Sequence, residues 1–231
     1  MPAVWGTQEY DPHRFLELLD WVMKRRISYV FLKLVAGASH PVKELSEALS
    51  IFKRVYDDDK TRVKKSVVIE VCSGKRGLVA ALCALFLRNV TGVAVDVVSD
   101  AVEPLKELSS VLGSKLRLFM GIDVYSDEFA KLVESLRREF EYVVMVAIHS
   151  CRTLAVRIME IFKRCQCDKL ILVPCCAHPS WARKTVGVEI HGYWDWIYAL
   201  WKYATEVLQL PARVEIEHAM LSNANAVIVI E

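Results

Sequence analysis

Residues 66–85, SVVIEVCSGKRGLVAALCAL, determine the expected fold of the chain. The run 67–71 is apolar apart from Glu70, which is typical of a parallel strand covered on both faces. Residues 72–77 then turn the chain, and their glycines can adopt backbone angles that a side chain forbids. From residue 78 the sequence has the length and composition of a packed helix. A strand, a turn and a helix in this order predict an open α/β sheet, which binds ligands at the carboxyl ends of its strands.

Glu70, the acid in this stretch, indicates which ligand the turn binds. A phosphate loop needs a Gly-Lys-Ser/Thr element, which is missing here. A dinucleotide turn needs G-x-G-x-x-G, and only Gly74 and Gly77 keep its last spacing. An acid two residues before the turn suits a ligand that carries an ammonium group and no phosphate, as S-adenosylmethionine does. We therefore expect Glu70, Cys72, Ser73 and Gly74 to bind this cofactor.

The same residues resemble the first motif of class I methyltransferases, E-x-G-x-G-x-G. Cys72 takes the place of the first glycine and Arg76 that of the third. The resemblance implies a Rossmann-like, seven-stranded, mostly parallel sheet. The segments 213–220 and 226–230 resemble the C-terminal antiparallel hairpin that closes such a sheet, and the first of them alternates as an edge strand does.

Acids also lie at or after the ends of the next two predicted strands, 91–98 and 115–120. Asp96, at the end of the first of these, suits the ribose hydroxyls of an adenosine, and Asp100 is a less favoured substitute. Asp123 could accept a hydrogen bond from the adenine amino group. Acids at strand ends are common in α/β loops, but three in succession strengthen the prediction of a cofactor site.

Two further motifs follow the predicted strands 142–148 and 169–173. They resemble the H-x-C-G and C-C-H motifs of a group of class I methyltransferases that includes the tRNA acceptor-stem 2′-O-methyltransferases. The matching residues are His149, Cys151, Cys175, Cys176 and His178. Arg152 replaces the usual glycine, and Ala177 separates the cysteine pair from the histidine. The resemblance implies methyl transfer to a tRNA ribose, with tRNA as the partner.

Ribose methylation requires a group that removes the proton of a hydroxyl. A histidine titrates near neutral pH, so His149 and His178 are the predicted catalytic residues. His149 is also predicted to bind the cofactor, because it lies close to the reacting methyl. Lys75 or Arg76 would steer a phosphate of the RNA. The other predicted substrate contacts are Cys151, Cys175, Cys176, Arg183 and Lys184.

The cysteines allow other roles. Zinc could be held by Cys165, Cys167, Cys175, Cys176 and His178, but C-x-C and C-C lack the usual C-x₂₋₄-C spacing, so we expect no metal. A disulfide that includes Cys165 or Cys167, and a nucleophilic Cys175 or Cys176, are also possible roles. A cysteine is otherwise a small buried hydrophobe, and Cys83 on its apolar helix is expected to be one.

Residues 1–65 are predicted to form a helical N-terminal extension, and residues 66–231 the methyltransferase domain. One helix should run from Asp11 to about residue 35, and a second from 41 to 56. The extension is either a packing cap on the sheet or a substrate-recognition element. In the second case its basic residues contact RNA phosphates: Lys24, Arg25, Arg26, Lys60, Arg62, Lys64 and Lys65.

Aromatic residues gather in the last third of the chain. Trp194, Tyr198 and Trp201 share one face of a predicted helix. This face either packs on the sheet or stacks on the bases of a nucleic acid.

Composition and charge limit the classes of function that the chain can have. The chain has 231 residues, of which 54% are hydrophobic and 25% charged, so it can build a large core. A net charge of +2 neither requires nor excludes nucleic acid. The apolar runs fall short of the ~18 residues of a membrane span, and the amino terminus lacks a signal pattern, so we expect a cytoplasmic protein. Methyl transfer to a small molecule or a protein, and a non-catalytic cofactor- or RNA-binding subunit, remain alternatives; the oligomeric state is not indicated.

Overall fold

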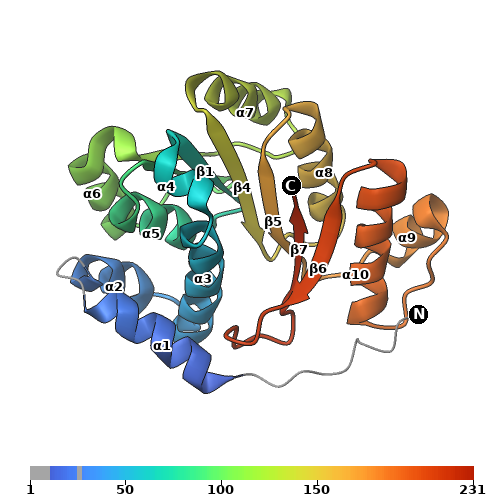
Figure 1. The fold of residues 1–231 in the computed structure, drawn as a ribbon, viewed down its shortest axis with the longest axis horizontal. Helices are drawn as coiled ribbons and strands as arrows, with labels where there is room; N and C mark the ends of the chain where they lie inside the picture. Colours follow the sequence, from blue (N-terminus) through green and yellow to red (C-terminus); the bar gives the residue numbers. More distant parts are fainter. Residues whose placement is uncertain (1–10, 25–27) are drawn as a thin grey trace.

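The computed structural model describes residues 11–24 and 28–231 as three layers, with one sheet between two layers of helices (Figure 1). The seven strands of the sheet are β1 Ser66–Val71, β2 Val90–Asp96, β3 Leu116–Met120, β4 Tyr142–Ile148, β5 Lys169–Val173, β6 Ala212–Ile216 and β7 Ala226–Ile230. Their spatial order is β3-β2-β1-β4-β5-β7-β6. Strands β1 to β5 pair in parallel, whereas β7 is antiparallel to both β5 and β6. The predicted sheet, its C-terminal hairpin and its edge strand are confirmed.

The helices divide between the two faces. One face is covered by α1 Pro12–Met23, α2 Ser28–Ala36, α3 Pro41–Tyr56, α5 Leu78–Phe86 and α6 Glu103–Leu112. The other face is covered by α7 Asp127–Glu139, α8 Thr153–Arg164, α9 Pro179–Val186 and α10 Tyr193–Lys202, which continues into a π-helical turn, Tyr203–Val207. The short α4, Asp59–Val63, precedes β1, and a 3₁₀ turn, Gly113–Lys115, precedes β3.

Strand β1 lies at the centre and is buried over its whole length. Val67, Ile69 and Val71 pack against the α7–α10 layer, while Val68 packs against the opposite layer. Successive side chains of a strand point to opposite faces, so an apolar run of this kind is stable only between two helical layers.

The N-terminal helices pack in the same hydrophobic cluster as the sheet. Leu49 and Phe52 of α3 belong to the cluster that includes Val68 and the apolar residues of α5. Arg54 of α3 binds Glu215 and Glu217, with Nη2 2.9 Å from Oε2 of Glu217, at the outer strand β6. The structure therefore shows the N-terminal helices packed on the sheet, which is one of the two roles suggested for them from the sequence.

Several boundaries differ from the sequence prediction. The single helix expected over 11–35 is two helices, with residues 25–27 outside the described part. Helices α4 and α9 were not predicted. Strand β6 ends at residue 216 rather than 220, because the chain then turns and the buried Glu217 pairs with Arg54.

The buried face of α10 is not the face formed by Trp194, Tyr198 and Trp201, for which packing on the sheet was one expectation. Trp196 is the fully buried aromatic residue of α10, and Trp181 and Tyr203 lie in the same cluster. Tyr198 is 37% exposed and stacks on Trp201. In the described part of the chain, no helix combines the length and apolar character needed to cross a bilayer.

Candidate functional site

A cavity of about 360 Å³ lies where β1 and β4 end, and α3 borders it. Its volume falls in the range of small-molecule sites, roughly 300–1,000 Å³. The lining comes from the turn after β1, from the first turns of α3, and from Ile148 and His149 at the end of β4. Three elements distant in sequence therefore build one site, at the carboxyl edge where open α/β sheets bind ligands.

The first residue after each of these two adjacent strands has an unusual backbone. Cys72 and His149 both have a φ of 58°, in the left-handed region that non-glycine residues seldom adopt. Each such conformation costs on the order of 1 kcal/mol and tends to occur at functional sites. In the same turn Gly77 has a φ of 49°, and a Cβ there would come within 2.8 Å of Ala94.

Glu70 lies under the turn and lines the cavity. It is only 6% exposed, and its Oε2 accepts a hydrogen bond from the amide of Ala80 at 2.8 Å. Burial raises the pKa of Glu70 to about 7, and the nearby Asp96 charge adds to this rise. A positively charged ligand group beside Glu70 would favour its ionised form.

Asp96 is the last residue of β2, and Asp123 follows β3, as expected. The Oδ2 atom of Asp96 accepts from the amide of Gly74 at 2.7 Å, and its Oδ1 accepts from Val98 at 2.9 Å. Asp96 thus also holds the turn after β1, although a carboxylate keeps further lone pairs for a ligand. Asp123 is exposed and accepts from the amide of Tyr125 at 2.9 Å. Neither carboxyl group is part of the cavity lining.

His149 is held by two side chains of α3. Its Nε2 lies 3.0 Å from Oε2 of Glu47 and 3.0 Å from Nζ of Lys43, and that Nζ is 3.0 Å from the other oxygen of Glu47. Glu47 is only 3% exposed at its side chain. Burial opposes its charge, but the hydrogen bond and charge of His149, and then those of Lys43, lower the pKa of Glu47. A buried carboxylate therefore joins two basic groups at the cavity.

Sequence reasoning missed Lys43 and Glu47, because the helical extension was not connected to the cofactor motif. One signal was available. Glu47 stands one turn before Ile51 and two turns before Val55 on the buried face of an amphipathic helix. An acid at a core position of a helix needs a partner of opposite charge. For Glu47 one partner, Lys43, is on the same helix, and the other, His149, follows β4.

The two basic residues of the turn behave differently. Lys75 is exposed and lines the cavity. The guanidinium of Arg76 donates to the carbonyl oxygens of Leu34, at 3.1 Å, and of Gly37. Arg76 therefore ties the turn to α2, and its predicted contact with substrate phosphate would have to compete with these bonds.

His178 and the basic residues that follow it lie apart from His149. The Nδ1 atom of His178 accepts from the amide of Trp181 and contacts the Ser180 hydroxyl, both at 3.2 Å, and so caps α9. Arg183 and Lys184 are exposed on α9, and Arg183 lines a separate cavity of about 340 Å³. None of these three belongs to the lining of the His149 cavity, and their catalytic or substrate-binding roles stay predictions.

The basic residues expected to contact phosphates do not surround the site. Lys60, Arg62, Lys64 and Lys65 lie at the amino end of β1, and six strand residues, roughly 20 Å, separate them from the turn. Lys24 pairs with Asp20 at 2.5 Å. Arg25 and Arg26 are outside the described residues.

The structure separates the cysteines into two groups. Cys165 and Cys167 are buried before β5, whereas Cys175 and Cys176 follow it, so the zinc set predicted as an alternative cannot meet at one ion. Instead, Cys151 joins Cys175 and Cys176. All seven cysteines are free thiols, including Cys165 and Cys167, and Cys83 is fully buried as expected.

The turn and its cavity fit S-adenosylmethionine. A Cβ added at Gly74 would meet nothing within 4 Å, so the backbone of the turn is accessible to a ligand. The buried carboxyl of Glu70 lies beside it, in a position to meet the ammonium group of an amino-acid ligand. Nothing in this part of the lining is arranged as a phosphate loop.

Comparison with known proteins agrees with this geometry. Residues 40–180 match the family model described as a methyltransferase domain. No curated protein matches the chain significantly. Among solved structures, a methyltransferase from Geobacter sulfurreducens has a TM-score of 0.51 at 12% identity, over 97% of this chain and 98% of the other. Because identity is so low, this likeness concerns the fold alone.

Two further structures are less similar. An SAH-bound methyltransferase from Podospora anserina has a TM-score of 0.41 at 13% identity, over 97% of this chain and 89% of that one. A candidate RNA methyltransferase from Pyrococcus horikoshii has a TM-score of 0.44 at 14% identity, over 94% of this chain and 93% of that one.

The family match extends over more than half of the chain and includes α3, the turn after β1 and His149. The chain therefore belongs to the methyltransferase domain family, and S-adenosylmethionine is its methyl donor.

Proposed function

We propose that this methyltransferase acts on RNA and that its acceptor is the 2′-hydroxyl of a tRNA ribose. The observation that carries the proposal is the contact of His149 with Glu47 and Lys43 at the edge of the cofactor cavity. A hydroxyl is a poor nucleophile until its proton is removed, so an enzyme of this kind needs a positioned base.

The contacts of His149 suit that task. An ionised Glu47 can only accept a hydrogen bond, so its contact with His149 is satisfied when Nε2 carries the proton. In that tautomer the Lys43 ammonium, which can only donate, bonds to the other oxygen of Glu47 and not to Nε2. Nδ1 then keeps its lone pair and can take the proton of a hydroxyl. The Glu47 carboxylate would stabilise the imidazolium that results, as the acid does in a Ser-His-Asp triad.

The cofactor supplies an activated methyl group, so the remaining work of the chain is to position the acceptor. Glu70 and the backbone of the turn at Ser73 and Gly74 would hold the cofactor. The cavity lining has three lysine or arginine side chains and three glutamates, and Lys43 is paired with Glu47. The exposed Lys75 is the basic group that would meet a phosphate close to the reacting ribose. Methyl transfer to an uncharged small molecule would not require this lysine.

The experiment is methyl transfer from labelled S-adenosylmethionine to unmodified tRNA, followed by nucleoside analysis. We expect a 2′-O-methylated nucleoside. The variants His149→Gln and Glu47→Gln should each lower kcat by about 100-fold or more, with cofactor affinity retained, because general base catalysis contributes roughly 10²–10⁴. Glu107→Gln, on the exposed face of α6, is the matched control and should keep full activity.

Each other outcome selects a different function. A base-methylated nucleoside would discard the ribose acceptor. No incorporation into tRNA, with cofactor binding shown in parallel, would move the function to a small-molecule or protein acceptor or to a non-catalytic subunit. Unchanged kcat in both variants would remove His149 and Glu47 from catalysis.

A further inference from the structure

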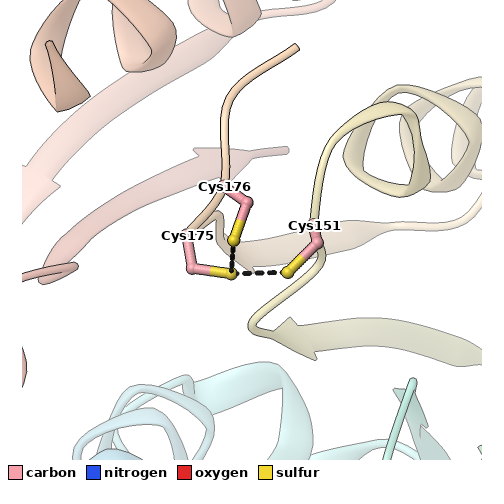
Figure 2. Close-up of side chains that lie close together, drawn as sticks. All are labelled: Cys151, Cys175 and Cys176. Atoms are coloured by element: carbon pink, nitrogen blue, oxygen red, sulfur yellow. Dashed lines mark hydrogen bonds between the residues drawn. The ribbon is translucent and has the colours of Figure 1, made fainter.

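Three thiols meet beside the cofactor site and have no role in the proton transfer described above. The Sγ atoms of Cys151 and Cys175 are 2.7 Å apart, and that of Cys176 is 3.5 Å from Cys175 (Figure 2). All three sulfurs lie within 4.8 Å of one another. Figure 2 shows the three side chains pointing toward one another from two separate loops, the one after β4 and the one after β5.

The backbone holds these two loops together. The amide of His149 donates to the carbonyl of Val173 at 2.9 Å, and the amide of Arg152 donates to the carbonyl of Cys176 at 2.8 Å. Cys151 lies between these two bonds. His149 and Arg152 both have positive φ, 58° and 55°, so the loop adopts an uncommon path around Cys151. The convergence of the thiols is therefore set by the backbone rather than by side-chain rotamers alone.

The number of sulfurs favours a metal ion over a disulfide. A disulfide needs two sulfurs at about 2.05 Å and would leave the third unused. Tetrahedral zinc with Zn–S bonds of about 2.3 Å places its sulfurs roughly 3.8 Å apart. The Cys151–Cys175 and Cys175–Cys176 spacings, 2.7 Å and 3.5 Å, are shorter than that value, so the side chains would have to move apart slightly to hold the ion. Thiolates are also the ligands that select zinc over hard cations such as magnesium.

We propose that Cys151, Cys175 and Cys176 form a zinc site with an open fourth position. Cys176 is exposed and the other two are partly buried, so an ion can reach the site from solvent. Three protein ligands and one open position are the pattern of zinc sites that bind an exchangeable ligand, whereas structural sites are closed by four. The site is independent of the tRNA proposal, because its ligands are complete without cofactor or acceptor.

This assignment differs from the cysteine set considered from the sequence. Cys165 and Cys167 precede β5 and the pair Cys175 and Cys176 follows it, and five strand residues span roughly 16 Å. The double variant Cys165→Ser/Cys167→Ser is therefore a matched control: it removes two thiols of the same chain without touching the proposed site.

The test is the zinc content of the full chain, purified under reducing conditions and measured by plasma mass spectrometry without cofactor or RNA. We expect one zinc ion per chain, with a Kd below about 1 µM by competition with a chelator. Cys176→Ser, the exposed position, should lower the zinc affinity at least tenfold while the circular dichroism spectrum stays unchanged. Cobalt added to the metal-free protein should give a thiolate-to-cobalt charge-transfer band that Cys176→Ser and Cys151→Ser weaken and the control variant keeps.

Three results would overturn the proposal: no zinc bound by the reduced protein, zinc retained in full by the triple Cys151/Cys175/Cys176→Ser variant, or a Cys151–Cys175 disulfide that persists under reducing conditions. Methyl transfer is measured separately, so failure of the tRNA assay would leave the zinc result standing, and the converse also holds.

Discussion

Replacing Glu70 by glutamine should change how the stability of the chain depends on pH. Burial raises the pKa of Glu70 from an ordinary 4.5 to about 7. Between these values the unfolded chain releases a proton that the folded chain retains, so the free energy of unfolding falls as the pH rises. Each pKa unit is worth about 1.4 kcal/mol, and the full loss is therefore roughly 3 kcal/mol, complete above pH 7.

Glutamine removes this dependence while its side-chain oxygen can still accept from the amide of Ala80. We expect the free energy of unfolding of Glu70→Gln, relative to the wild type, to increase by about 3 kcal/mol between pH 4 and pH 8. Urea unfolding of both proteins at several pH values measures the difference, in which other titrating groups cancel. Glu107→Gln, at an exposed position, should give a difference that is flat with pH.

A flat difference for Glu70→Gln, or one that decreases with pH, would refute the reasoning. The cofactor provides a second test of the same carboxyl. If the ammonium group of S-adenosylmethionine lies beside Glu70, binding near pH 6 should release protons, because the positive charge favours the ionised carboxylate. Calorimetry in buffers of different ionisation enthalpy measures this release, and Glu70→Gln should abolish it.

Two further predictions concern packing and an ion pair. Gly92→Ala should destabilise the fold by about 3 kcal/mol or more, because a Cβ at Gly92 would lie 2.0 Å from the carbonyl oxygen of Ala80. Thermal or urea unfolding measures the loss. A variant as stable as the wild type would show that this close contact does not exist. Arg54→Met should cost roughly 3 kcal/mol, since it leaves the carboxylate of Glu217, only 8% exposed, without its cation. Lys53→Met, at an exposed position of the same helix, is the control, and equal losses in both variants would argue against the buried pair.

The sheet could be predicted from sequence because its signals are local. The apolar runs at 142–148 and 169–173 correspond residue for residue to β4 and β5, since buried parallel strands admit almost no polar residues. Helix α9 was missed because it is short and follows the loop of Cys175 and Cys176, whose composition indicated a motif rather than a helix. Its start depends on the capping histidine His178, a role that a sequence does not reveal.

The site was predictable only in part, for a related reason. Glu70 lies near the end of one recognisable strand and His149 follows another, so their places at the carboxyl edge follow from the parallel topology. The partners of His149 come from α3, about 100 residues earlier in the chain. The hydrophobic periodicity of a sequence does not show that positions so far apart in the chain lie together. In the same way the meeting of Cys151 with Cys175 depends on the pairing of β4 with β5, which determines which loops become neighbours.

Helix α3, which carries Lys43 and Glu47, is fastened to a segment made much later in the chain. The hydroxyl of Ser46 accepts from the amide of Leu221 at 2.9 Å, and Arg54 binds Glu217. A ribosome therefore releases the turn after β1 and helix α3 long before it releases the residues that anchor that helix. We expect a nascent chain to acquire a fixed wall beside the cavity only once β6 and the loop after it have emerged from the ribosome.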